Sequence, residues 1–150
     1  MTVTGGHTRE QLRQSYADAW RKHLARSPLT PLEALIADVI EWHPEYQLAV
    51  QNVAAAPAPD PARAEAAENP FLHMGLHIAV REQISIDRPP GIRALEAALE
   101  SQLGDRHGAE HALMEALGET LWEAQRAGRA PDEGHYMELA RRRLKARPTR

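Results

Sequence analysis

The sequence predicts an all-α protein that folds as one helical bundle of five to seven helices. Alanine, leucine, glutamate and arginine, which favour helices, are abundant, while the aromatic residues that favour strands make up only 5% of the chain. Apolar residues recur three and four positions apart in several segments, and capping residues, proline or glycine bound these segments. A length of 150 residues suits a single domain, which we expect over residues 1–150.

Two helices are predicted before residue 44. The first begins at Thr8, because T-R-E-Q forms a capping box and apolar residues at helical spacing follow it. The second begins at Thr30, where T-P-L-E combines a hydroxyl cap, a proline in the first turn and a glutamate three residues after the cap. Its apolar stripe continues to His43. Pro44 then breaks or kinks the helix, because proline cannot donate to the helical hydrogen-bond ladder.

A linker is predicted between this region and the next helix. Residues 53–68 are rich in alanine and proline and contain no large apolar residue after Val53. Asn69 and Pro70 form another helix start, and this helix is expected to run to Asp87, where R-P-P-G forces a turn.

Three further helices complete the predicted bundle. A short one spans 91–103 and ends at Gly104, and a long one capped by Asp105 ends at Gly128. The last begins near Pro131 and leads into a basic tail at about residues 141–150. The basic residues of this tail need no partner, because cations are favourable at a helix C-terminus. The net charge of −3 also makes a nucleic-acid partner unlikely.

Composition excludes several classes of protein. The chain has no cysteine, so any metal must be bound by nitrogen or oxygen ligands. It has no signal-like N-terminus and no apolar segment near the roughly 20 residues that cross a bilayer, so we expect a cytoplasmic protein without a membrane partner. Nucleophile-elbow, phosphate-loop, dinucleotide-binding and H-E-x-x-H motifs are absent as well.

The histidines form the most suggestive pattern. His73 with His77, and His107 with His111, are two H-x-x-x-H pairs, each inside a predicted helix. Residues four apart lie on one helix face, so two imidazoles can bind one ion, and two such helices can supply four nitrogen ligands. Both pairs border apolar stripes, which predicts that they face the core.

Two more residues join this predicted metal site. Glu110 falls near the middle of an apolar arc, where a carboxylate is rare unless it is paired or bound to a cation. His43 lies on the buried side of its own helix. Mixed imidazole and carboxylate ligands suit a divalent transition metal, with Fe or Zn expected, at one ion or two. Glu110 is either a ligand or an orienting residue, and Glu82 is a reserve carboxylate.

The alternative hypothesis is a metal-free interaction or structural module. In that case the same histidines and Glu110 form a hydrogen-bonded buried network, and a protein partner or a second copy of the chain binds elsewhere. An enzyme without a metal is a third possibility, with Glu110 and a neighbouring histidine as acid and base. Arg81 next to Glu82 is interpreted as part of a surface or inter-helix salt bridge rather than as a catalytic pair.

Seven short sequence blocks are distinctive: W-H-P-E-Y (42–46), N-P-F-L-H (69–73), R-E-Q (81–83), D-R-P-P-G-I (87–92), A-E-H (109–111), L-W-E-A-Q (121–125) and P-D-E (131–133). Together they resemble a bacterial family catalogued only as a domain of unknown function, number eighteen forty-one. The resemblance covers about residues 8–140 and implies a bacterial, cytoplasmic protein. It brings no activity and no catalytic residues.

Overall fold

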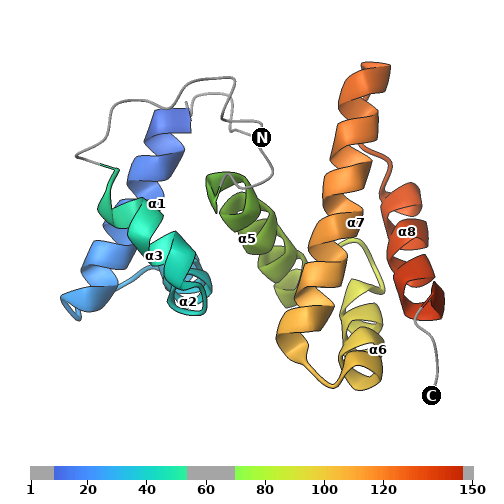
Figure 1. Ribbon diagram of the computed structural model, residues 1–150, viewed down its shortest axis with the longest axis horizontal. Coiled ribbons are helices and arrows are strands. Elements are labelled where there is room, and N and C mark those ends of the chain that lie inside the picture. Colours follow the sequence, from blue (N-terminus) through green and yellow to red (C-terminus); the bar gives the residue numbers. More distant parts are fainter. Residues whose placement is uncertain (1–8, 54–69, 147–150) are drawn as a thin grey trace. The chain divides into compact units, whose positions relative to one another are not determined.

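The computed structural model describes residues 9–53 and 70–146, and within them it confirms the all-α prediction (Figure 1). These residues form seven helices and no strand. The helices are α1 (Arg9–Leu24), α2 (Pro31–Glu41), α3 (Pro44–Gln51), α5 (Pro70–Ile86), α6 (Ile92–Leu103), α7 (Arg106–Ala127) and α8 (Glu133–Ala146).

The chain divides into two compact units, Met1–Ile78 and Ala79–Arg150. The boundary falls inside α5, a continuous helix whose first half belongs to one unit and whose second half belongs to the other. In the first unit α1, α2 and α3 pack against one another. In the second unit α7 packs against both α6 and α8.

The first unit is organised around the apolar stripe of α2. The predicted capping box is present: the Glu33 backbone donates to the Thr30 hydroxyl at 3.1 Å, and the Thr30 backbone donates to the Glu33 carboxylate at 2.9 Å. Lys22 of α1 donates to the same carboxylate at 2.8 Å, which ties α1 to the start of α2. The core that this arrangement buries consists of Ala19, Trp20, Ile36, Ala37, Val39, Ile40, Tyr46, Val50, Met74 and Ile78.

Pro44 breaks the helix rather than kinking it. α2 ends at Glu41, and Pro44 takes the first position of α3, where a missing backbone N–H costs nothing. His43 between them is the N-cap of α3, with extended backbone angles of φ −133° and ψ 101°. Its side chain is therefore directed by a helix start and not by the face of a longer α2.

The second unit begins and ends its long helix as the sequence predicts. The Asp105 carboxylate accepts hydrogen bonds from the backbone N–H groups of His107 and Gly108, at 3.2 and 2.9 Å. Gly104 and Gly128 have φ of 73° and 68°, the left-handed conformation that favours glycine after a helix. The largest fully buried apolar side chains of this unit are Val80, Ile92, Leu99 and Leu113.

Some predicted features lie outside the described residues. These are the Thr8 cap, the linker after Val53, the Asn69 cap and residues 147–150. Residues 141–146 of the predicted basic tail belong to α8, which ends at Ala146. Arginine, leucine, lysine and alanine are all strong helix formers, so this stretch extends the helix instead of leaving it.

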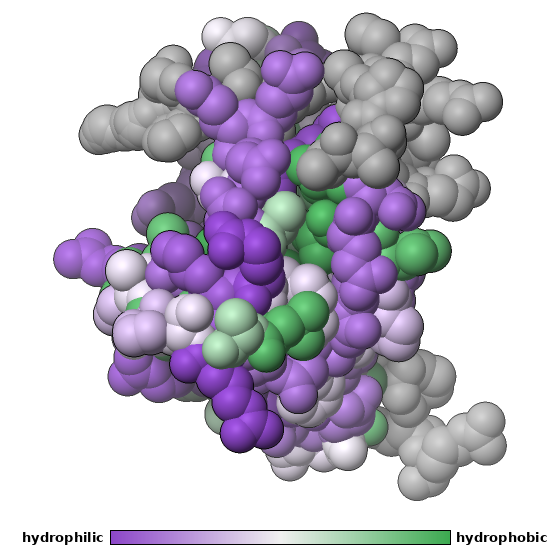
Figure 2. Space-filling view, turned by 90° about the vertical axis from the view of Figure 1, so that its left-hand side faces the viewer, coloured by the Kyte–Doolittle hydropathy of each residue, from purple (hydrophilic) through white to green (hydrophobic). Residues whose placement is uncertain are grey.

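Hydrophilic side chains predominate on the molecular face of Figure 2, and hydrophobic ones form small groups on it. Exposed large apolar side chains include Trp42 at 50% and Trp122 at 56%. The Trp122 ring is covered in part by the Arg126 guanidinium, 4.6 Å from the ring centroid. None of the described helices combines the length and apolar character needed to span a membrane.

Candidate metal centre

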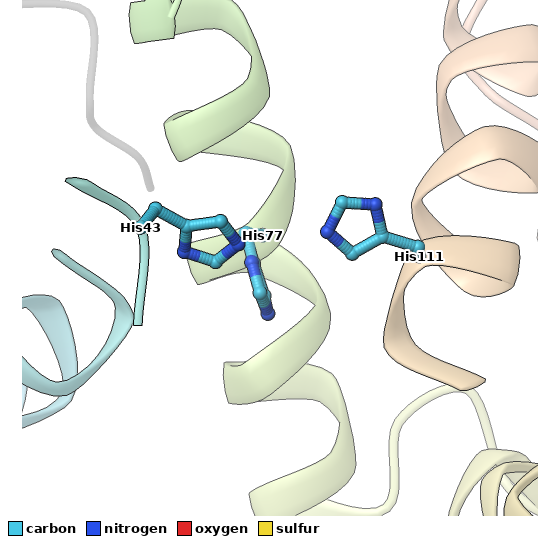
Figure 3. A group of neighbouring side chains, drawn as sticks. All are labelled: His43, His77 and His111. Carbon is cyan, nitrogen blue, oxygen red and sulfur yellow. The ribbon is translucent and has the colours of Figure 1, made fainter. Parts of the chain in front are cut away.

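Three of the six predicted site residues come together. His43, His77 and His111 each offer one ring nitrogen, and these nitrogens all lie within 4.8 Å of one another (Figure 3). His43 precedes α3, His77 lies in the middle of α5, and His111 lies in the second turn of α7. His43 and His77 are buried, and His111 is half-buried.

His43 is held in one orientation by its own backbone neighbourhood. Its Nδ1 lies 2.8 Å from the backbone carbonyl oxygen of Val39. A carbonyl oxygen can only accept, so Nδ1 carries the proton and a neutral imidazole keeps its lone pair on Nε2. The ring of Tyr46 stacks on the His43 ring at 4.1 Å with an interplanar angle of 27°. His43 therefore presents a fixed ring with Nε2 as its donor atom.

His77 packs directly on His43. The two ring centroids are 4.9 Å apart and the rings meet edge to face at 78°. The His77 side chain is fully buried. Polar side chains are rarely buried without a bonding role. We therefore expect the His77 imidazole to bind a polar group or an ion rather than only to fill space in the core.

Only one member of each H-x-x-x-H pair belongs to this group of three histidines. His73 is exposed, and the group that contains His77 does not include it. The rings of His107 and His111 are in contact at 4.3 Å, yet only His111 belongs to the group. Side chains four residues apart on a helix differ in direction by about 40° and lie about one turn apart along the axis. The second histidine of each pair therefore does not share the exact position of the first on the helix face.

Glu110 is buried and ion-paired. Its carboxylate oxygens accept hydrogen bonds from Nε of Arg81 at 3.0 and 2.9 Å, and Oε2 also accepts from Nε of Arg106 at 3.0 Å. Glu110 is 1% exposed and Arg81 is 8% exposed. The cations beside this carboxylate are two guanidinium groups.

The sequence interpretation missed the partner of Arg81. It predicted a surface or inter-helix salt bridge there without naming Glu110 as the partner, and the adjacent Glu82 is exposed. Glu82 lines a cavity of about 590 Å³ together with Gln83 and Tyr136, where the Tyr136 hydroxyl donates to Gln83 at 2.6 Å. The missed signal is helical spacing: Arg81 follows the buried His77 by four residues and so shares its side of α5.

Glu96 of α6 is a second buried carboxyl in this unit. It is 8% exposed, and its Oε2 has no hydrogen-bond partner among the described residues. Burial raises the pKa of the Glu96 carboxyl above its ordinary value of 4.5, and the neighbouring Glu100 carboxylate raises it further. Arg106 opposes this shift only in part. The charged form of Glu96 is thus less favourable in the folded protein than in the unfolded chain.

Glu96→Gln is expected to make the protein more stable at neutral pH and to change little at acidic pH. A raised pKa stabilises the fold fully below the ordinary value, and this contribution is lost as the pH rises through the raised value. Glutamine has no charge to desolvate, so the stability gap should widen as the pH rises above 4.5, the ordinary pKa of the carboxyl, and should stay constant above the raised pKa. Urea midpoints measured from acidic to neutral pH test this prediction, and Glu119→Gln is the control because Glu119 is exposed. Midpoints of the wild type and Glu96→Gln that change with pH in parallel would contradict it.

Comparison with known proteins identifies a family. No curated protein and no solved structure matches the chain. Residues 8–142 match a family described as a domain of unknown function (DUF1841), and this match includes His43, His77, Arg81, Glu110 and His111. The match covers well over half of the chain and agrees with the resemblance seen in the sequence blocks. The chain therefore belongs to the DUF1841 family.

Proposed function

We propose that this protein binds one divalent transition-metal ion through His43, His77 and His111. The observation that carries the proposal is that three imidazole nitrogens from three different helical segments lie within 4.8 Å of one another. Zn–N bonds of about 2.0–2.1 Å place tetrahedral ligand nitrogens about 3.4 Å apart. The widest nitrogen pair would thus need to close by no more than about 1.4 Å, which small rotations of the rings supply.

The donor set indicates which ions to expect. With Glu110 engaged by Arg81 and Arg106, all three donors of the group are imidazole nitrogens. Imidazole suits Zn, Fe, Cu and Ni, whereas Mg and Ca prefer oxygen ligands. Zn and Fe remain the ions we expect first. Glu110 is then a residue beside the site and not one of its ligands.

The orientation of His43 also supports metal binding. A histidine that binds a metal usually donates its other ring N–H to a carbonyl or carboxylate, which fixes the ring and the tautomer. The contact between His43 Nδ1 and the Val39 carbonyl is this arrangement. The ligand atom would be Nε2, so little side-chain freedom remains to be lost on binding.

Among the described residues the group offers three ligands, and three protein ligands leave one coordination position open on a tetrahedral ion. Structural zinc sites use four protein ligands, while catalytic sites keep one position for water or substrate. Such an ion lowers the pKa of bound water or polarises an oxygen of a substrate. We therefore infer a site of the open kind, with the reaction and substrate left to experiment.

Elemental analysis of untagged protein purified without chelator tests the proposal. We expect about one Zn or Fe per chain in the wild type. His43→Ala, His77→Ala and His111→Ala should each lose most of the metal, while His73→Ala should keep it, because His73 is exposed and outside the group. His73 is a matched control, being the same residue type in the same helix as His77.

Two results would overturn the proposal. One is wild-type protein that contains no metal and takes up neither Zn nor Fe(II) when these are added. The other is equal metal content in the wild type and all three ligand variants. Either result would favour the metal-free hydrogen-bonded network.

A further inference from the structure

We infer that Arg81 and Glu110 are positioning residues of the metal centre, and this inference rests on the proposed function. The two side chains do not belong to the group of His43, His77 and His111, but each lies within one helical turn of one of these histidines. Arg81 follows His77 by one helical turn on α5, and Glu110 immediately precedes His111 on α7. Their ion pair therefore connects the two helices next to both ligands.

The geometry of the pair makes it a directional link. Nε of Arg81 donates to both oxygens of the Glu110 carboxylate, at 3.0 and 2.9 Å. Because one N–H is shared between the two oxygens, this is a bifurcated hydrogen bond, and the charges of both partners make it stronger than a neutral one. Sliding of α7 along α5 by one residue, about 1.5 Å, would displace the carboxylate oxygens from their positions opposite Nε. The contact thus fixes the position of α7 along α5 near His111, at the turn of α5 that follows His77.

Burial makes the pair hard to replace by other contacts. Arg81 is 8% exposed and Glu110 is 1% exposed, so neither charge can be hydrated in place of its partner. Arg106 bonds to the same carboxylate from one turn earlier on α7, but its side chain is 52% exposed. Arg106 holds the carboxylate within its own helix, whereas Arg81 connects it to a second helix.

Metal sites are sensitive to such links. A site tolerates displacements of only about 0.5 Å in its ligands before affinity falls, and loss of an outer residue that orients ligands costs 10–100-fold in affinity. Arg81 and Glu110 should therefore affect how tightly and in what geometry the ion is bound, even though neither touches it.

The experiment measures Co(II) binding to the full chain by its visible absorption spectrum. The variants are Arg81→Met/Glu110→Leu, which removes both charges so that neither is left buried and unpaired, and Arg81→Lys, which keeps the charge but loses the planar fork. Arg142→Met is the control, because Arg142 forms only an exposed pair with Glu138 of its own helix. Thermal unfolding without metal is recorded for each protein.

We expect Co(II) affinity to fall at least 10-fold in the double variant and by a smaller factor in Arg81→Lys, with a changed spectrum in both. Arg142→Met should match the wild type. The inference is overturned if folded variants bind Co(II) with wild-type affinity and spectrum, and Arg81→Lys decides the matter if the double variant does not fold. Failure of the wild type itself to bind Co(II) would instead refute the proposed function.

Discussion

Glu110→Leu is expected to lower the free energy of unfolding by about 3–5 kcal/mol. The substitution leaves the Arg81 guanidinium, only 8% exposed, without the carboxylate to which it donates two hydrogen bonds. Removing one partner of a buried ion pair costs far more than the pair contributes, because the remaining charge is desolvated and uncompensated. Arg106 should add little to the loss, since its 52% exposed side chain can return to water. Urea denaturation of the metal-free protein measures the effect.

Glu138→Leu is the matched control for this experiment. Glu138 also pairs with an arginine, at 3.5 Å, but both side chains are more than half exposed. Exposed pairs contribute about 0–1 kcal/mol, so this variant should remain within that range of the wild type. Adding Arg81→Met to Glu110→Leu should recover most of the lost stability. A Glu110→Leu protein that unfolds within 1 kcal/mol of the wild type would show that the buried charge is tolerated.

Zinc is expected to raise the free energy of unfolding of the metal-free protein by about as much as Glu110→Leu lowers it. An ion that binds only the folded chain stabilises it by about 4 kcal/mol at a free concentration 1,000 times its Kd. For a protein of this size, this corresponds to a rise of Tm by roughly 10 °C. Differential scanning calorimetry at graded zinc concentrations measures the shift and its dependence on ligand concentration.

The same experiment carries two internal controls. Magnesium at equal concentration should leave Tm unchanged, because it prefers oxygen ligands and the site offers nitrogen. His77→Ala should lose the zinc response, whereas His73→Ala should keep it. A Tm that rises equally in His77→Ala and in the wild type would show that zinc stabilises the protein from some other place.

Most of the fold could be predicted from local sequence signals. The capping box at Thr30 and the Asp105 cap are chemical patterns read within four residues, and the structure contains both. Gly104 and Gly128 end helices for an equally local reason. The division of the chain inside α5 could not be predicted, because it depends on contacts between residues far apart in sequence. The extra turns of α8 were missed because charged residues were interpreted as a tail despite their helix propensity.

The candidate site was predicted in part. The buried side of α2 pointed to His43, and the apolar arc of α7 pointed to Glu110 and its need for a cation. Spacing within one helix could not show that His77 and His111 would group with His43 while His73 would not. That outcome depends on how helices rotate against one another. The Arg81 partner of Glu110 lies 29 residues away, beyond the reach of any local pattern.

The proline between α2 and α3 limits how this protein can be stabilised by design. Replacing Pro44 with alanine would restore a backbone donor and a strong helix former, and a designer seeking a longer, sturdier helix would choose this position early. A continuous helix would turn residue 43 from a cap into an interior position, and its imidazole would leave the Val39 carbonyl and the Tyr46 ring. A continuous helix through residues 41–44 and the present orientation of the His43 ring are therefore mutually exclusive. With proline at position 44, the protein has the orientation of the ring and not the continuous helix.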